Sequence, residues 1–297
     1  MTHGFESLGL TRRRLLSLAT LAAGVGAAGM LAACTEEQRQ KIANRPIRKN
    51  IATLAPNDPI ITSYKTAITK MQALPSSDGR NWTRQAQIHN SFCRHSSWLV
   101  LPWHRAYLFY FEQICKELSG NEDFALPYWN WTTSPQIPAV FFEPGSPLNH
   151  SPRLATASST VSASVAGPTV ISNILGEGNF LLFAGDPVAL NSTAQFGPGS
   201  GPLESGPHNT IHGFVGGDMG TFMSPLDPIF WTHHGRMDEL WVEWNILRDN
   251  PNTNDPNWVN TEFTEFFDRK GNQVSVKVIF TVLYPYLSYR YDTQVAP

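Results

Sequence analysis

Histidine residues are concentrated in two short windows of the sequence. The chain has nine histidines in 297 residues, and seven of them fall in these windows: His89, His95, His104, His208, His212, His233 and His234. His208 and His212 are four positions apart, so on a helix their rings share one face. The neighbours His233 and His234 differ by about 100° around a helix, so one is expected to be a ligand and the other a packing residue. This pattern indicates metal binding through imidazole nitrogens.

The two windows supply three imidazoles for each of two metal ions. Ligand sets of this kind suit copper, zinc or nickel. No Asp or Glu lies between His208 and His212 as in the zinc protease motif, and no Cys-x-x-Cys-His haem attachment occurs. The absence of bridging carboxylates argues against a hydrolytic two-metal centre. We therefore expect two copper ions.

The elements that position these histidines are predicted to be helices. Apolar residues recur at helical spacing over 60–71, 103–118 and 227–247, and the helix over 103–118 begins after a proline and ends at a Ser-Gly-Asn sequence. Residues 274–282 alternate and form the one strand candidate. Residues 146–206 are rich in Ser, Ala, Thr, Gly and Pro, which predicts a long surface excursion. The fold class is therefore mainly α.

Composition excludes several other classes of protein. The 22 Lys and Arg residues nearly balance 24 Asp and Glu residues, so the net charge of -2 provides no basic surface for nucleic acid. A hydrophobic content of 41% excludes bulk disorder, and 22 Gly with 22 Pro favours a loop-rich body over a coiled coil.

Residues 1–33 are predicted to be an export signal. Three arginines from Arg12 onward precede an uncharged apolar run and resemble the signal of the Tat route, which exports folded proteins. The residues before Cys34 resemble a lipobox, in which cleavage leaves Cys34 as a lipidated N-terminus; alternatively an ordinary signal is cut nearby and Cys34 is incidental. We expect a membrane-anchored lipoprotein, periplasmic or on the cell surface, with residues 34–50 as a tether and a copper chaperone as a candidate partner.

Several motifs resemble those of tyrosinases and other type-3 copper proteins. Residues 95–105, His-Ser-Ser-Trp-Leu-Val-Leu-Pro-Trp-His-Arg, resemble the first copper motif. Residues 207–212, Pro-His-Asn-Thr-Ile-His, together with 227–234, Asp-Pro-Ile-Phe-Trp-Thr-His-His, resemble the second. The Tyr-Arg-Tyr sequence at 289–291 resembles the tyrosine motif that closes the catalytic domain. The resemblance makes residues 51–297 the copper-binding catalytic domain.

The resemblance implies the ligands, the fold and the activity. It implies three imidazole ligands for each copper ion: His89, His95 and His104 for the first, and His208, His212 and His234 for the second. It implies an antiparallel four-helix bundle around a dinuclear copper site, with long loops and a few short strands. The implied activity uses dioxygen to hydroxylate monophenols and to oxidise o-diphenols to o-quinones. A diphenolase-only catechol oxidase and an o-aminophenol oxidase share these ligands.

An oxygen carrier of the haemocyanin type is the alternative from a different class. Carriers usually join several such modules and cover the site, whereas this sequence holds one module. We also expect no covering domain after Tyr291, so latency is not expected.

Finer roles follow from positions in the resembling motifs. Cys93 lies two residues before His95, as in relatives whose cysteine forms a thioether with the histidine ring; the alternative is a free thiol near copper. Glu204 and Asn209 match positions that hold and polarise a water beside the second copper. The alternative is that Asn209 caps a helix and that Glu204 is a loop carboxylate without a role in the site.

Four further side chains have expected roles. Phe222 matches an aromatic gate over the first copper, and Met223 competes for this role because the loop is one residue shorter than usual. Asp238 is one turn after His234 and is expected to orient a ligand ring or its neighbour. Arg105 and Glu112 are expected to form a structural ion pair.

Overall fold

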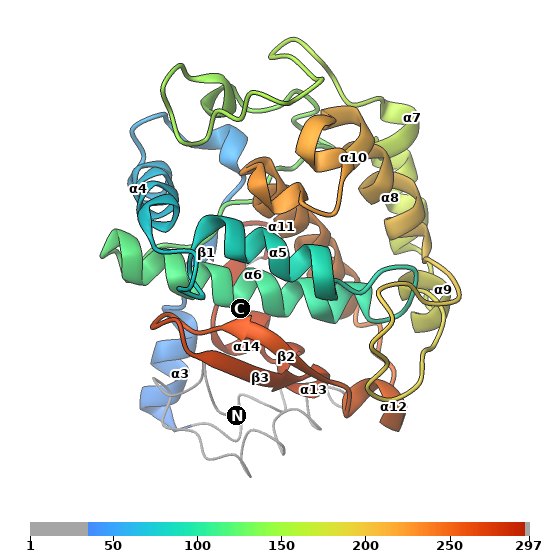
Figure 1. The fold of residues 1–297 in the computed structure, drawn as a ribbon. Coiled ribbons are helices and arrows are strands. Elements are labelled where there is room, and N and C mark those ends of the chain that lie inside the picture. The colour runs from blue at the N-terminus through green and yellow to red at the C-terminus, as the bar shows by residue number, and fades with distance from the viewer. Residues whose placement is uncertain (1–34, 295–297) are drawn as a thin grey trace.

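Helix α6 (Val100–Ser119) crosses the middle of the molecule and is buried along most of its length (Figure 1). The computed structural model describes residues 35–294. Helices α4 (Pro59–Ala73) and α11 (Ile229–Val242) pack against α6, and α5 (Trp82–Phe92) contacts α4. The mainly α fold with long loops and few short strands is confirmed, while its description as an antiparallel four-helix bundle stays a prediction.

Both ends of α6 have an identifiable cause. The helix begins at Val100, three residues before the predicted start, because Pro102 lies in the first turn, where its missing N–H has no helical partner to lose. It ends at Gly120, whose φ of 75° is left-handed and whose N–H donates to the carbonyl of Lys116. The aromatic and aliphatic side chains between these ends are buried, so the helix is held mainly by packing.

Wider π-helical turns accompany both helices of the second histidine window. The turn η4 (Glu204–His208) leads directly into α10 (Asn209–Val215). Helix α11 likewise continues into η7 (Glu243–Leu247), so the helix predicted over 227–247 is present from Ile229 onward. Turns of this kind occur frequently at functional sites.

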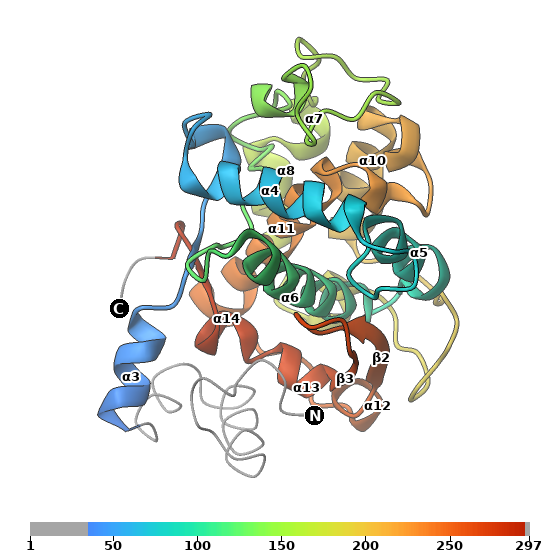
Figure 2. The same ribbon diagram turned by 60° about the vertical axis from the view of Figure 1, so that its left-hand side comes forward.

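Two small sheets complete the core. Strand β1 (Ile47–Arg48) pairs in parallel with β4 (Arg290–Tyr291), and β2 (Glu262–Phe267) pairs antiparallel with β3 (Gln273–Lys277). The β2–β3 hairpin lies beneath α6 in both views (Figures 1 and 2). The strand predicted over 274–282 is wrong in its second half, where α13 (Val278–Thr281) forms. Lys277 pairs with the first residue of β2, so no partner strand remains beyond it.

The predicted excursion over 146–206 contains short helices. They lie along one side of the molecule (Figure 1) and are α7 (Ala163–Ala166), α8 (Pro168–Leu175) and α9 (Phe180–Ala184). Buried Phe183 stacks on Trp244 with ring centroids 4.4 Å apart, so the excursion is fixed to the end of α11. Two further short α-helices among residues 35–294 are α12 (Pro256–Val259) and α14 (Tyr284–Leu287).

The N-terminal segment is partly packed on the domain. Helix α3 (Glu36–Ala43) begins with a capping box at Thr35, and the following β1 places Arg48 in the core. The last residues of the expected tether are therefore in contact with the body. The predicted signal over 1–33 and Cys34 lie outside the described residues.

Within residues 35–294, none of the helices is both long and apolar enough to cross a membrane.

Asp238 connects α11 to α6 and to both ends of the described chain. Its carboxylate accepts hydrogen bonds from Arg105, Arg48, Tyr289 and Tyr291. The expected role of Asp238 at a ligand ring is therefore wrong, and so is the expected pair of Arg105 with Glu112. Glu112 pairs with Arg48 at 2.9 Å instead, because Arg105 and Glu112 are two turns apart on α6 whereas Asp238 faces Arg105 from α11.

Candidate dinuclear metal centre

The structure brings the seven histidines of the two windows into two adjacent clusters. In each cluster one ring nitrogen of every histidine lies within 4.8 Å of those of the others; the first contains His89, His95 and His104, and the second His208, His212, His233 and His234. Helices α5 and α6 and the loop between them supply the first cluster, while η4, α10 and α11 supply the second. The rings of His104 and His234 stack at 4.2 Å, so the clusters share one centre.

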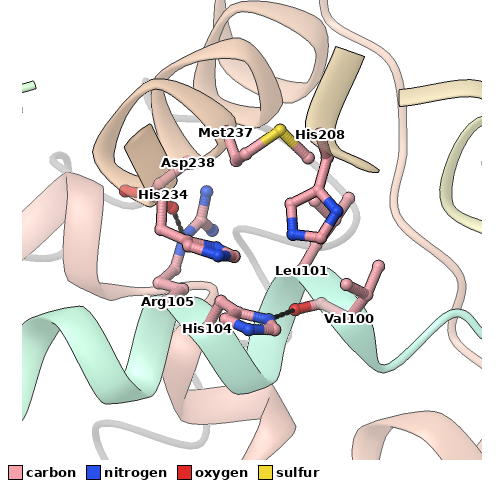
Figure 3. Close-up of a pocket in the computed structure, with 8 residues that line it drawn as sticks. All are labelled: Val100, Leu101, His104, Arg105, His208, His234, Met237 and Asp238. Atoms are coloured by element: carbon pink, nitrogen blue, oxygen red, sulfur yellow. Dashed lines mark hydrogen bonds and ion pairs between the residues drawn. The ribbon is translucent and has the colours of Figure 1, made fainter. Parts of the chain in front are cut away.

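Three elements converge on the inner side of this centre. Figure 3 shows the rings of His104, His208 and His234 around one small space. Its volume is about 10 Å³, and Val100, Leu101 and Met237 line it as well. A space of this size takes about one water molecule, and the three imidazoles around it are buried.

Four of the rings are oriented through Nδ1. The acceptors are the carbonyl oxygens of Phe222, Val100 and Met219 for His89, His104 and His212, and Oδ1 of Asn209 for His208, at 2.7–2.8 Å. A carbonyl only accepts, so Nδ1 carries the proton and Nε2 keeps its lone pair. Nε2 of His89, His104 and His208 is buried with no partner among the described residues. The donor set therefore fits a metal ion on each side of the centre.

Burial keeps the imidazoles neutral. It lowers the pKa of His89 to about 3 and that of His212 to about 4, and it lowers the pKa of His95, His104 and His208 well below the usual value. The neutral ring is the form that binds a metal ion. The protein therefore presents metal ligands rather than imidazolium ions at neutral pH.

His95 is held differently from the other rings of the first cluster. Its Nδ1 is buried without a partner among the described residues. Its backbone is fixed, since its N–H donates to the carbonyl of Gln195 at 2.6 Å and its own carbonyl accepts from Gly197 at 2.9 Å. Cys93, two residues earlier in the sequence, is buried and forms no disulfide. Burial raises the pKa of its thiol to about 12. The main chain at His95 is therefore rigid, while its ring has no Nδ1 hydrogen bond.

Both adjacent histidines of α11 belong to the second cluster. Nε2 of His234 is 3.3 Å from Nε2 of His212. The ring of His233 stacks on that of His208 with centroids 5.4 Å apart. One of the two histidines was expected to be a ligand and the other a packing residue. The rings of both are buried at the same centre.

A cavity of about 660 Å³ opens on the outer side of the centre and contains the other candidate residues. Glu204 reaches it from η4, and its Oε1 accepts a hydrogen bond from the backbone N–H of Ser96 at 2.8 Å. Oε2 is buried without a partner among the described residues, and burial raises the pKa of Glu204 to about 7. Asn209 lines the same cavity. Both are thus at the centre, and Asn209 bonds to a ligand candidate, a contact that a simple helix cap would not need.

Aromatic side chains cover the mouth of the cavity. The ring of Phe222 lies 6.2 Å from His89 and 6.1 Å from His95 between centroids, and Met223 also lines the cavity. The ring centroid of Phe196 lies 5.5 Å from that of Phe222. Phe196 was not predicted from the sequence to be a site residue. It belongs to the Ser-, Gly- and Pro-rich excursion, where no periodic pattern separates a functional side chain from a loop residue.

Residues 216–224, which we call the strap, connect the two clusters. The carbonyls of Met219 and Phe222 orient one imidazole in each cluster. At one end of the strap His150 Nε2 lies 2.7 Å from Asp218 Oδ2, and just beyond the other end Arg153 forms a two-point ion pair with buried Asp227. These contacts join distant parts of the sequence, and no local pattern predicts them.

Comparisons with known proteins agree with this centre. A family model described as the common central domain of tyrosinase matches residues 64–180 and 188–247. A second, described as the polyphenol oxidase middle domain, matches residues 252–297. All seven clustered histidines lie inside the first match.

Individual relatives cover most of the chain. Polyphenol oxidase A1 of Vicia faba is 30% identical, over 86% of this chain and 49% of its own length. The (+)-larreatricin hydroxylase of Larrea tridentata is 31% identical, over 73% of this chain and 44% of its own length. The chain thus spans about half the length of these curated relatives. The crystal structure of Grenache (Vitis vinifera) polyphenol oxidase matches with a TM-score of 0.76 and 28% identity, covering 86% of this chain and 87% of that one.

The match over the central domain, the relatives and the imidazole clusters lead to one conclusion. The chain belongs to the tyrosinase family of copper oxidoreductases, whose members use a dinuclear copper site.

Proposed function

We propose that this chain oxidises phenols with dioxygen at two copper ions held by six imidazoles. The ligands are His89, His95 and His104 for the first ion, and His208, His212 and His234 for the second. The observation that carries the proposal is the convergence of unpartnered, buried Nε2 atoms from both clusters on one centre. When bound, the copper ions supply the electron transfer between phenol and dioxygen.

His234 is preferred over His233 as the third ligand of the second ion. Its Nε2 is 3.3 Å from Nε2 of His212, and its ring stacks on His104 of the first cluster. His233 stacks on His208, and both of its ring nitrogens are buried without a partner among the described residues. The choice of His234 therefore also rests on the resembling motif, in which the second histidine of the pair is the ligand.

Both proposed reactions use dioxygen as the oxidant. Two o-diphenols lose four electrons and four protons while one dioxygen becomes two waters, giving two o-quinones. A monophenol and one dioxygen give one o-quinone and one water. The monophenol must first lose its hydroxyl proton, whose pKa is about 10, so a base is needed at neutral pH.

We propose that Glu204 and Asn209 hold and polarise the water that receives this proton. Glu204 Oε2 is buried and free to accept a hydrogen bond, and its pKa of about 7 suits proton exchange at neutral pH. Asn209 is fixed by its hydrogen bond to His208, directly beside the second cluster. The name of the Larrea relative, a hydroxylase, is consistent with monophenol chemistry in this family.

A thioether between Cys93 and His95 would fix the one ring of the first cluster that has no Nδ1 partner. Forming it joins Sγ to a ring carbon in place of one S–H and one C–H bond, and the two protons and two electrons released reduce one dioxygen to hydrogen peroxide. The chain then weighs two hydrogens less than the sum of its residues. Mass spectrometry of the intact purified protein tests this. A mass without the loss of two hydrogens would mean that Cys93 is a free thiol.

Phe222 is proposed as the aromatic gate over the first cluster, with Met223 beside it. The Phe222 ring is near both His89 and His95, and 39% of its surface is exposed, so it covers the ligands while reaching solvent.

Export by the Tat route and anchoring through lipid at Cys34 are part of the proposal. They rest on the sequence of residues 1–34, as does delivery of copper by a chaperone before export. Cell fractionation with and without globomycin tests the anchor; an unlipidated, globomycin-insensitive mature protein would refute it.

Copper loading followed by oxygen-uptake assays tests the central proposal. The copper-loaded protein is given a monophenol, a catechol and an o-aminophenol in parallel, with a His104→Ala and His234→Ala double variant as control. Turnover of the monophenol and the catechol is expected. Turnover of the catechol alone or of the o-aminophenol alone selects the narrower oxidases. Reversible oxygen binding without any turnover would make the protein an oxygen carrier.

A further inference from the structure

The backbone of Phe196 is fixed against the loop that carries His95. Besides the two hydrogen bonds at His95, the N–H of Gly199 donates to the carbonyl of Ser96 at 2.8 Å. Gly197 allows this approach, since a Cβ there would lie 2.5 Å from the Cβ of Ser97. The side chain of Phe196 is therefore presented from a rigid backbone, although it lies in a long loop region.

The rings of Phe196 and Phe222 form an edge-to-face pair at the cavity mouth. Their centroids are 5.5 Å apart at 74°, and they lie 6.4 and 6.1 Å from the ring of His95. Exposure of 54% for Phe196 is high for a phenylalanine. Two neighbouring exposed aromatic rings above a ligand cluster are typical of a binding surface, because aromatic pairs stack well with a third ring.

The cavity that the aromatic pair lines has space for a large substrate. Gly213 and Gly220 line the cavity, and a Cβ at either would meet no atom within 4 Å. The cavity volume of about 660 Å³ is in the range of pockets that enclose drug-sized ligands. One phenol ring does not fill it.

No Lys or Arg side chain of residues 35–294 lines the cavity to pair with an acidic substituent of the substrate. Among the described residues that line it, Glu204 is the one acidic or basic side chain apart from the imidazoles. A carboxylate on the substrate would find no Lys or Arg there and would face Glu204 across the cavity. An uncharged substituent has no such penalty.

We propose that Phe196 is a specificity-determining residue, and that it selects uncharged phenols in which a second planar aromatic ring is joined to the phenol ring. The phenol ring enters toward the imidazoles while the second ring packs on Phe196 and Phe222. This inference rests on the proposed phenol oxidation and names the substrate class for it.

The test compares two uncharged catechols, one with a single ring and one with a second planar ring attached. Wild type is expected to favour the two-ring catechol in kcat/KM. Phe196→Ala is expected to reduce that preference about threefold to tenfold, through KM rather than kcat, and Phe196→Tyr to restore most of it. Leu190→Ala, a change of another exposed residue outside the cavity, is the control and should leave the preference unchanged.

A second readout needs no turnover. Zinc supports no redox chemistry, so calorimetry on the zinc-loaded protein measures binding of the same catechols. The Kd of the two-ring catechol is expected to rise about threefold to tenfold in Phe196→Ala, with no change for the single-ring catechol. Equal effects on both catechols, or none on either, would overturn the inference. A wild type that binds the two-ring catechol selectively but oxidises no phenol would instead overturn the proposed function.

Discussion

Nδ1 of His89 donates a 2.8 Å hydrogen bond to the backbone carbonyl oxygen of Phe222. Three residues earlier on the strap, the carbonyl of Met219 accepts from His212 of the other cluster at 2.7 Å. A ligand ring on each side of the centre is thus oriented by one short segment, which also carries the proposed gate. Mutations that move the strap should therefore affect metal binding as well as substrate entry.

Loosening the strap at His150 should weaken metal retention. His150→Leu removes the hydrogen bond to Asp218, and the half-time for transfer of copper to a chelator should shorten about twofold to fivefold, the effect of losing one hydrogen bond worth about 0.5–1 kcal/mol. His150→Gln keeps an N–H donor and should retain copper nearly as wild type does. Asn149→Ala, at the exposed neighbouring position, serves as control. Equal release rates for all four proteins would contradict a role of this pair.

Replacing Glu204 should separate the two phenol activities. Glu204→Gln should lower monophenol hydroxylation at least tenfold while diphenol oxidation falls less, because the catechol is the stronger acid and needs less help from a base. Oxygen uptake with matched monophenol and catechol substrates checks this. Equal losses would mean that Glu204 has a structural role.

The same variant should change how the metal-free protein responds to pH. Burial raises the pKa of Glu204 from 4.5 to about 7, so the folded state binds the proton more tightly than the unfolded state. The contribution of Glu204 to the free energy of unfolding is fully present below about pH 4.5 and is lost as the pH rises to about 7. The stability gain of Glu204→Gln over wild type should therefore grow across this range, as measured by urea unfolding at several pH values.

The buried histidines should give the metal-free protein the opposite response in acid. The pKa of His89 is lowered to about 3 and that of His212 to about 4, below the usual histidine value of 6.5 that holds in the unfolded chain. Their contribution to stability is present above pH 6.5 and is lost as pH falls toward these values. NMR of the imidazole Cε1–H signals should show neutral rings at pH 5.5. Titration near pH 6.5 would mean that the rings are solvated.

Removing the charge of Asp238 should be strongly destabilising. Although burial raises its pKa, Arg105 and Arg48 hold the pKa below the usual value, so the buried carboxylate is charged. Asp238→Asn leaves two buried guanidinium groups without their shared anion and should reduce the free energy of unfolding by about 3–5 kcal/mol. The partly exposed pair of Arg248 and Glu243 offers a control, since Glu243→Gln should cost less than about 1 kcal/mol. Guanidinium unfolding of the metal-free proteins measures both.

Local patterns in the sequence predicted two of the helices that carry clustered histidines, α6 and α11, but not α5, which carries His89. The spacing of His208 and His212 placed them on one face, and their rings lie 4.6 Å apart. The strand predicted over 274–282 ends at Lys277, because Lys277 pairs with Glu262, the first residue of β2, and the alternating pattern beyond it has no partner strand.

Tertiary partners were not predictable in the same way. Arg105 was paired with Glu112 on its own helix, whereas the structure pairs it with Asp238 across the helix interface. The positions of Phe196 and of the strap carbonyls depend on backbone contacts between segments about a hundred residues apart, which leave no periodic signal.

Because the strap carries an acceptor for one imidazole in each cluster, the binding of metal at the two clusters should be coupled. Ordering residues 216–224 around either cluster brings the Met219 and Phe222 carbonyls into place together, so the conformational entropy of that ordering is lost once rather than twice. The first ion to bind thereby raises the affinity for the second, and by reciprocity the second raises the affinity for the first. The protein should consequently load copper in pairs, with few molecules holding a single ion.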